Sequence, residues 1–446
     1  MTMPRTLPLP MVLQSFLWIR YPVQVMNYCR KEFGPTFMVR LPRFQMVMLT
    51  EPDAIRTMFA SKGDDLHAGK VNTILRAIVG SSSVLLLDGA EHMRHRKLLL
   101  PSFHGERMRF YGETMADIAR QSIATWPDHD VFALHEKTQD ITLQIILRTV
   151  FGVDEGTQMH KLAAQLTRLL RLGENPLFLP VMVALAQDPT LEKRMPWKWI
   201  LRDRDETDAL LFKQIAARRA EPESERSDVL AMLLKARDEK GQGLSDQELR
   251  DELITALVAG HETTATGLAW AFERILLHKP VYDRLKQEVR DAGGVHATPE
   301  KLAALPYLDA TIKEVLRLRP VIPFVGRVLQ QPMQLGGYDL PQGTAVAACI
   351  YLAQRNPDVY PDPDAFLPER FLNGQPDPAS WLPFGGGIRR CIGAAFALYE
   401  MKIVMGTILA HTELALENDQ PADIKRRAIT FWPAGGTRLR KLSHAA

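Results

Sequence analysis

The chain has 446 residues and a net charge of +3, with 46% hydrophobic and 24% charged residues. This composition is ordinary for a soluble globular protein, and so small a net charge argues against nucleic acid as a partner. The three cysteines are widely spaced and form no Cys-x-x-Cys pair, which indicates a reducing compartment rather than a disulfide framework. We therefore expect a cytoplasmic protein.

The first patterned segment is an apolar run from Met11 to Ile19, interrupted by Gln14 and Ser15. A membrane-spanning helix needs roughly 20 mostly apolar residues, so this run is too short for a membrane anchor. No small-residue cleavage site follows it, which argues against a signal peptide. The run predicts an amphipathic first helix that packs on the body of the protein.

Alternating apolar and polar residues from 36 to 49 predict a pair of strands. Thr50 and Asp53 then predict the cap and the first turn of a helix. Helical periodicity dominates from about 90 to 320, and β-branched and turn residues return from 336 to 351.

These patterns predict a mainly α fold with small β regions (α+β), the strands lying near residues 36–50 and 325–351. No internal repeat or low-complexity linker interrupts the chain. We therefore expect residues 1–446 to form a single domain.

The longest predicted helix starts at a capping box formed by Ser245 and Glu248 and meets no strong stop before Lys279. Its middle reads AGHETTATG, residues 259–267, which are poor helix formers. A weak polar centre in a long apolar helix predicts a local opening where another group fits. The alternative is poor propensity tolerated inside a well-packed helix.

Five short motifs contain the candidate functional residues. Taken singly, the His/Arg and Glu/Arg pairs are more often solvated surface pairs than functional groups. In chain order the motifs are HxxxR (His92, Arg96), AGxET (Ala259, Gly260, Glu262, Thr263), ExxR (Glu314, Arg317), PERF (Pro368 to Phe371) and FxxGxRxCxG (Phe384, Gly387, Arg389, Cys391, Gly393).

Together these motifs resemble those of the cytochrome P450 superfamily, the haem-thiolate monooxygenases, in its soluble bacterial form. The resemblance runs from about residue 30 to the C-terminus. It implies the cytochrome P450 fold, with a long central helix over a haem and a proximal cysteine loop, and no fused reductase domain. It also implies a haem b whose iron is bound by the thiolate of Cys391.

The resemblance assigns further residues around the haem. Phe384 is expected to pack beside the thiolate, and Gly387 and Gly393 to let the backbone pass close to the porphyrin. Glu314 and Arg317, together with Arg370, are expected to form a buried charge cluster that holds the proline-rich segment before the cysteine loop. The expected partners of the haem propionates are His92, Arg96, Arg327 and Arg389.

Glu262 and Thr263 resemble the acid–alcohol pair that delivers protons during oxygen activation in this family. His261, inside the same motif, is expected to point away from the haem. Apolar residues dominate the positions that usually line the pocket, which favours a lipophilic substrate such as a fatty acid, terpenoid, steroid or polyketide, although each residue is as readily core. The pocket candidates are Leu75, Ile78, Phe178, Ala259, Phe324 and Phe431.

The resemblance therefore implies hydroxylation or epoxidation of a lipophilic substrate with O2. No flavin- or nicotinamide-binding segment is present, so electrons are expected from a separate ferredoxin and ferredoxin reductase, with NAD(P)H as the ultimate donor. The alternatives are an isomerase or dehydratase that does not use O2, and a non-enzymatic haem protein that binds a ligand. The Glu262–Thr263 pair argues against the first alternative.

A basic run is expected near the thiolate face, where it would steer an acidic ferredoxin. A merely solvated charged face explains the same run equally well. The run comprises Arg94, Arg96 and Lys97, with Arg107 and Arg109.

Overall fold

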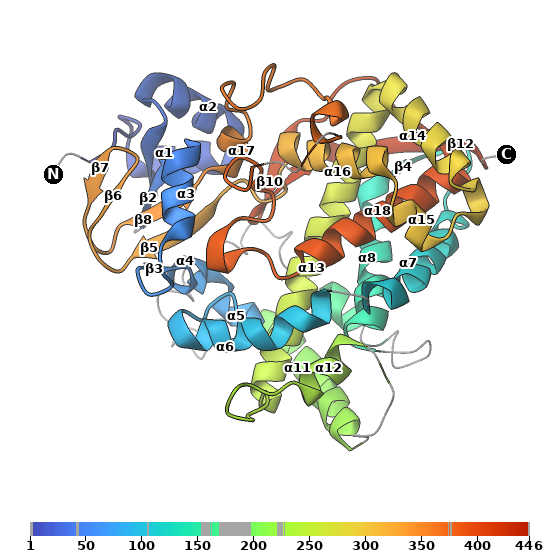
Figure 1. The fold of residues 1–446 in the computed structure, drawn as a ribbon, viewed down its shortest axis with the longest axis horizontal. Coiled ribbons are helices and arrows are strands. Elements are labelled where there is room, and N and C mark those ends of the chain that lie inside the picture. Colours follow the sequence, from blue (N-terminus) through green and yellow to red (C-terminus); the bar gives the residue numbers. More distant parts are fainter. Residues whose placement is uncertain are drawn as a thin grey trace.

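The computed structural model describes residues 3–41, 44–104, 107–152, 161, 163–168, 198–220, 226, 228–372, 374 and 377–444. Figure 1 shows a largely helical body crossed by α13 (Asp246–Leu277), with the largest sheet at one end beside α1 (Met11–Arg20) and α2 (Pro22–Phe33). The prediction of a mainly α fold with small β regions is confirmed.

The remaining helices surround α13 or join the sheets to the helical body. The α-helices are α3 (Pro52–Ala60), α4 (Gly69–Asn72), α5 (Arg76–Val79), α6 (Gly89–Leu99), α7 (Arg107–Ile123), α8 (Leu134–Thr149), α11 (Lys198–Arg219), α12 (Val229–Lys235), α14 (Lys279–Asp291), α15 (Pro299–Ala303), α16 (Pro306–Leu318), α17 (Ile350–Ala353) and α18 (Ala394–His411). The 3₁₀ helices are η1 (Thr73–Leu75), η2 (Leu100–Phe103), η5 (Gly294–His296), η6 (Pro368–Phe371), η7 (Gly387–Arg389) and η8 (Ala434–Gly436).

Within the described residues, the strands form one five-stranded sheet and three smaller ones. The large sheet has the order β1-β2-β8-β5-β3, in which only β2 and β8 pair in parallel. The smaller sheets are β10-β11, β4-β12-β9 and β6-β7. The strands are β1 (Thr36–Leu41), β2 (Phe44–Leu49), β3 (Leu66–His67), β4 (Val131–Ala133), β5 (Val325–Leu329), β6 (Met333–Leu335), β7 (Tyr338–Leu340), β8 (Ala345–Ala348), β9 (Thr412–Leu416), β10 (Ile424–Arg427), β11 (Thr430–Pro433) and β12 (Arg438–His444).

Both predicted β regions contain strands, but β3, β4 and β9 to β12 lie outside them. All of them are short; β10 and β11 pair with each other in a hairpin, whereas β3 and β4 pair with strands that are distant in the sequence. In β4, for example, Val131 pairs with Arg440 of β12. The local pattern of so short a strand does not reveal a distant partner, so β4 was not predictable from the sequence.

The predicted cap of α3 is wrong by one residue. Glu51 occupies the cap position and makes no side-chain capping bond, while Pro52 begins the helix with its φ angle already fixed. The Thr50 hydroxyl instead donates a hydrogen bond to the carbonyl oxygen of Pro35, 2.9 Å away. Asp53 lies in the first turn as predicted.

The central helix α13 has the predicted start and length. Ser245 Oγ accepts a hydrogen bond from the Glu248 backbone N–H, and Glu248 Oε2 accepts one from the Ser245 N–H, which completes the capping box. The 32 residues extend for about 48 Å at 1.5 Å per residue. The helix remains regular through residues 259–267, although their propensity is poor.

Two further helices, α18 and α1, are apolar enough to raise the question of membrane contact. Within the described part of the chain, α18 alone is long and apolar enough to cross a membrane, and two thirds of it is buried inside the protein. The first helix, α1, packs inward through Gln14 and Trp18, but its outward side chains are apolar, so the expected amphipathic pattern is wrong.

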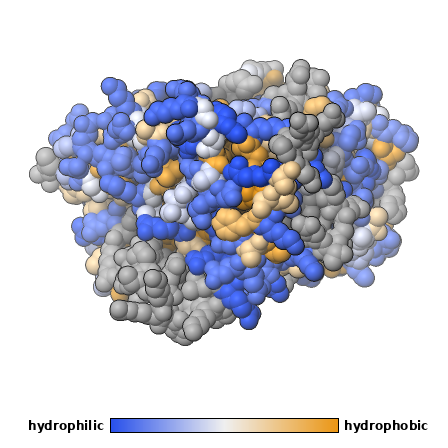
Figure 2. Space-filling view, turned by 90° about the horizontal axis from the view of Figure 1, so that it is seen from below, coloured by the Kyte–Doolittle hydropathy of each residue, from blue (hydrophilic) through white to orange (hydrophobic). Residues whose placement is uncertain are grey.

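On the face shown in Figure 2 the described surface is mostly hydrophilic, with hydrophobic side chains gathered near its centre.

A buried ion pair fixes the proline-rich segment before the cysteine loop. Glu314 and Arg317, one turn apart on α16, are fully buried, with Arg317 Nε 2.6 Å from Glu314 Oε2. The Arg317 guanidinium also donates hydrogen bonds to three carbonyl oxygens of the irregular chain, and the Leu367 N–H donates to Glu314 Oε1 at 2.9 Å. Those carbonyls belong to Gln354, Pro363 and Ala365.

Replacing Glu314 by alanine leaves the buried Arg317 charge unpaired. We expect Glu314→Ala to lower the free energy of unfolding by about 3–5 kcal/mol, measured by urea denaturation. Asp283→Ala, which breaks the exposed Lys279–Asp283 pair, is the matched control and is expected to cost less than about 1 kcal/mol. Equal losses in the two variants would contradict the structural role of the buried pair.

Candidate functional site

Cys391 differs from the other two cysteines in its surroundings. Cys29 and Cys349 are fully buried in an apolar cluster, where burial raises the pKa of each thiol to about 12. Cys391 is accessible at its loop position, just before α18. Desolvation by the surrounding loop raises the pKa of the Cys391 thiol. The Gly393 N–H and the charges of Arg96 and Arg390 oppose that rise. This is the one cysteine of the three that another group can reach.

The backbone of the cysteine loop is fixed from two sides. The Cys391 N–H donates a hydrogen bond to the Phe384 carbonyl oxygen at 2.9 Å, and the Phe384 ring packs edge-on against Trp381. Gly387 has a φ of +63°, and a Cβ added there would lie 2.3 Å from the Phe59 carbonyl oxygen. Gly387 is therefore required by the close approach of the end of α3, and the expected porphyrin contact at this glycine stays a prediction.

Gly393 differs from Gly387. Its φ is −84°, and a Cβ added there would meet no atom within 4 Å. Gly393 is also the residue that precedes the first turn of α18. The free space beside Gly393 is compatible with the expected close approach of a porphyrin, which stays a prediction.

The predicted propionate partners converge from three elements: His92 and Arg96 from α6, Arg327 from β5, and Arg389 from η7. Burial, together with the nearby charges of Arg389, Arg96 and Arg327, lowers the pKa of His92 to about 3. Burial likewise lowers the pKa values of Arg327 and Arg389 to about 10. The four side chains form a concentrated positive region that favours anionic ligands.

The acid within this cation cluster is Asp88, which pairs with Arg389. Arg389 also donates to the Val84 carbonyl oxygen at 3.1 Å, and Arg96 donates to the Arg390 carbonyl oxygen at 2.7 Å. The buried Nδ1 of His92 has no hydrogen-bond partner among the described residues. An unpartnered buried nitrogen beside three arginines and an accessible cysteine fits a haem, which has two carboxylates and an iron to bind.

One face of α13 is accessible at its centre. Ala259 is exposed, while Ala256, Gly260 and Thr263 are partly exposed, and these residues recur at the three- and four-residue spacing of one helical face. The Thr263 hydroxyl donates to the Ala259 carbonyl oxygen at 2.5 Å. The open face coincides with the segment whose sequence predicted a local opening.

Glu262 points toward α8 and β10, into a polar network. Gln139 Nε2 donates to Glu262 Oε2 at 2.6 Å, and both His135 Nε2 and Arg427 Nη1 lie 3.4 Å from Glu262 Oε1. Burial alone would raise the pKa of Glu262, but its His135 and Arg427 partners outweigh burial and lower it. Glu262 is therefore ionised at neutral pH.

Sequence reasoning missed these three partners of Glu262. Gln139 lies 123 residues before Glu262, and no local motif connects the two. His261 lies on the side of α13 that faces α8, where its Nε2 is 3.1 Å from the Gln139 carbonyl oxygen and burial lowers its pKa to about 4. His261 therefore packs against α8 rather than on the open face of α13.

The predicted pocket residues differ in their burial and in the apolar clusters that they pack against. Leu75 and Ile78 are partly buried, whereas Ala259 is on the open face of α13. The Phe324 ring lies 5.8 Å from the Trp18 ring. Phe431 is 3% exposed and packs against Tyr351, so the structure places it in the core. Phe178 lies outside the described residues.

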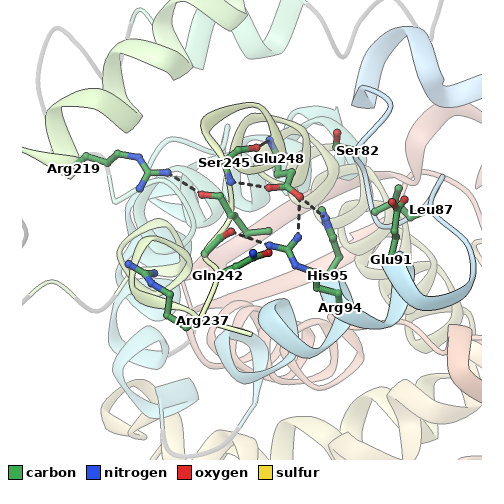
Figure 3. A pocket seen from close by; sticks show the side chains of 12 residues that line it. Ser82, Leu87, Glu91, Arg94, His95, Arg219, Arg237, Gln242, Ser245 and Glu248 are labelled. Atoms are coloured by element: carbon green, nitrogen blue, oxygen red, sulfur yellow. Dashed lines mark hydrogen bonds and ion pairs between the residues drawn. The ribbon is translucent and has the colours of Figure 1, made fainter. Parts of the chain in front are cut away.

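The basic run is largely paired, contrary to expectation. Arg94 donates to Asp238 at 2.7 Å and to Glu248 at 2.9 Å, and it lines a pocket of about 700 Å³ between α6, the C-terminal end of α11 and the N-terminal end of α13. Figure 3 shows the side chains of Arg94 and His95 pointing toward Glu248 in this pocket. Arg94 is therefore not a free surface charge, and Lys97 pairs with Glu239 at 2.7 Å. The side chains of Arg107 and Arg109 lie outside the described residues.

Fold and site together define a haem-thiolate protein, and comparisons with known proteins agree. The family model for cytochrome P450 matches residues 3–438. Cytochrome P450 135B1 of Mycobacterium tuberculosis is 39% identical over 430 residues, which cover 96% of this chain and 89% of the relative. Cytochrome P450 135A1 of the same species is 35% identical over 438 residues, which cover 97% and 93%.

A solved structure, retinoic acid bound cyanobacterial CYP120A1, superposes with a TM-score of 0.83 at 27% identity and covers 99% of both chains. The chain belongs to the cytochrome P450 family. It is a monooxygenase with a haem bound through a cysteine thiolate. Family membership implies electron transfer from a redox partner and a lipophilic substrate.

A buried histidine that the sequence analysis did not single out joins α6 to α13. His95 Nδ1 lies 2.7 Å from Glu252 Oε1, and its Nε2 lies 3.1 Å from Glu248 Oε1. Burial alone would lower the pKa of His95, but the two carboxylates outweigh burial and raise it. Burial also raises the pKa of Glu252. Both shifts mean that the folded protein binds protons more tightly than the unfolded chain.

This pair predicts a pH-dependent stability. The contribution of charged His95 is fully present below its unfolded pKa of about 6.5 and is lost as the pH rises through the higher folded pKa. We expect His95→Gln to lower the free energy of unfolding most near about pH 6 and progressively less toward about pH 9. The measurement is denaturant unfolding across this range, with His104→Gln as the exposed control. A difference that does not change with pH would contradict the coupling.

Proposed function

We propose that the chain is a haem-dependent monooxygenase in which Cys391 binds the haem iron and one oxygen atom of O2 enters a lipophilic substrate by hydroxylation or epoxidation. The observation that supports this most strongly is the accessible thiol of Cys391 beside the unpartnered His92 nitrogen and three arginines. When bound, the haem thiolate supplies the activation of O2 and the transfer of the oxygen atom. His92, Arg96, Arg327 and Arg389 would bind its propionates, and Phe384 would shield the thiolate.

We assign proton delivery to Glu262 and Thr263. The lowered pKa of Glu262 keeps its carboxylate ionised, and Oε1 faces His135 and Arg427 on the side of α8 and β10, from which a proton would enter the relay. Thr263 is the adjacent residue on the partly exposed face of α13. Rotation of its hydroxyl away from the Ala259 carbonyl oxygen lets Oγ1 donate a hydrogen bond into the open space.

The Thr263 hydroxyl gives the proposal its sharpest test. With a substrate selected by its haem spin-state shift and labelled O2, we expect Thr263→Ala to retain haem but to lower labelled product by roughly 100-fold. Hydrogen peroxide released per NAD(P)H oxidised should rise at the same time. Thr263→Ser keeps the hydroxyl and serves as the matched control, with product formation close to that of the wild type.

Tightly coupled product formation by Thr263→Ala would contradict the assignment of this residue. The same assay separates the alternative functions. Product formed by the wild type without O2 would indicate an isomerase or dehydratase. Ligand binding without any product, in the presence of O2 and electrons, would indicate a non-enzymatic haem protein.

We further propose a separate ferredoxin and ferredoxin reductase as the source of electrons from NAD(P)H, and a cytoplasmic location for one P450 domain spanning residues 1–446. Because Arg94 is paired inside the protein, the docking region is assigned instead to Ile388 and Arg390. Both are exposed in the cysteine loop, where an apolar contact and a positive charge suit a small acidic protein. Lys97 adds a second exposed cation, because its surface pair with Glu239 separates easily.

The substrate class is proposed to be a lipophilic molecule such as a fatty acid, terpenoid, steroid or polyketide. Partly exposed apolar side chains support this class, among them Leu75, Ile78 and Phe324, together with Ala259 on α13. CYP120A1, a relative in structure, holds retinoic acid, which is itself lipophilic. Retinoic acid is therefore the first compound for the spin-state titration.

A further inference from the structure

The outward face of α1 is apolar and uncovered. Val12, Phe16 and Ile19 are 77%, 58% and 53% exposed. They are spaced by four and three residues, so they lie along one side of the helix. Gln14 and Trp18 point to the opposite side, where they are buried. The helix is thus held by its inner face, and the outer apolar side chains are not needed to pack it.

This exposure is concentrated in one part of the chain. Of the 15 large apolar residues that are exposed in the described structure, eight lie between residues 3 and 21. Besides the three named above, they are Met3, Leu9, Met11, Leu13 and Tyr21. Scattered exposed apolar residues need no explanation, but a continuous apolar helix face indicates an interaction surface.

The charged residues near α1 in the sequence are almost all basic. Residues 1–33 include four basic side chains, Arg5, Arg20, Arg30 and Lys31, and a single acidic one, Glu32. Arg5, Arg20 and Lys31 are exposed. A partner that combines an apolar interior with a negatively charged surface matches both features, and an anionic lipid bilayer has that combination.

We propose that the outward face of α1 binds peripherally to an anionic lipid bilayer. The ten residues of α1 are about 15 Å long, far short of a membrane span, so the helix lies in the interface with Val12, Phe16 and Ile19 toward the acyl chains. Arg20 follows these residues at the end of the helix and contacts the lipid headgroups. A second copy of the chain fits less well, because a symmetric contact would bring the two positive segments together.

Such docking has a consequence that rests on the proposed function. Trp18, on the inner face of α1, contacts Phe324, which belongs to the proposed substrate pocket. Lipophilic substrates partition into bilayers, so docking through α1 brings the lipid phase close to that pocket. The binding itself does not depend on turnover, and its test therefore stands apart from the test of monooxygenase activity.

The experiment is cosedimentation of the full-length holoprotein with vesicles of phosphatidylcholine, with or without about one third phosphatidylglycerol. We expect binding to the anionic vesicles that weakens at high salt and little binding to the neutral ones. Val12→Glu combined with Phe16→Glu should weaken binding at least tenfold, roughly the loss for two buried apolar side chains. Leu442→Glu, an exposed apolar position on β12, is the matched control and should bind as the wild type does.

Three results would overturn the proposal. They are no binding of the wild type to anionic vesicles, equal binding by the Val12→Glu/Phe16→Glu variant, and a wild-type dimer that this variant converts to a monomer. The last result would mean that a second copy covers α1. All variants change exposed side chains, and the carbon monoxide spectrum of the reduced protein verifies that each is folded around its haem.

Discussion

The buried pair of Glu314 and Arg317 is the constraint on which the rest of this structure depends. Two opposite charges without solvent contact are stable only when every remaining donor and acceptor is used, and here the irregular chain from Gln354 to Leu367 supplies the partners. That chain contains too many prolines to hold itself by helix or sheet bonds. By fixing it against α16, the pair also fixes the start of the cysteine loop that follows.

The central helix shows a second compromise between stability and chemistry. Most of α13 is buried, yet its poorest helix-forming residues are retained at the centre, where small side chains leave one face accessible. On the adjacent side Glu262 is tied to α8 and β10 by Gln139, His135 and Arg427. One short segment thus presents open space on one side and a connected polar network on another. That arrangement suits proton transfer toward a site kept away from bulk water.

The sequence predicted those features whose signals are local. The capping box of Ser245 and Glu248 and the one-turn pair of Glu314 and Arg317 each lie within a few residues, so their geometry follows from the local sequence. Features that depend on distant segments were not predictable: the pairing of Arg94 with Asp238, the partners of Glu262, and the contact that requires Gly387, which comes from Phe59. Phe431 was assigned to the pocket rather than to the core for the same reason, because its ring partner Tyr351 is far away in the sequence.

The central claim is that Cys391 provides the thiolate that binds the haem iron. Its most direct test is the absorption spectrum of the dithionite-reduced protein with carbon monoxide, recorded for the wild type and for Cys391→Ser. We expect the strongly red-shifted Soret band of thiolate-ligated haem in the wild type and its loss in the variant, with Cys349→Ser unchanged as the control. A wild-type band at the ordinary position, or a red-shifted band that survives in Cys391→Ser, would contradict the assignment.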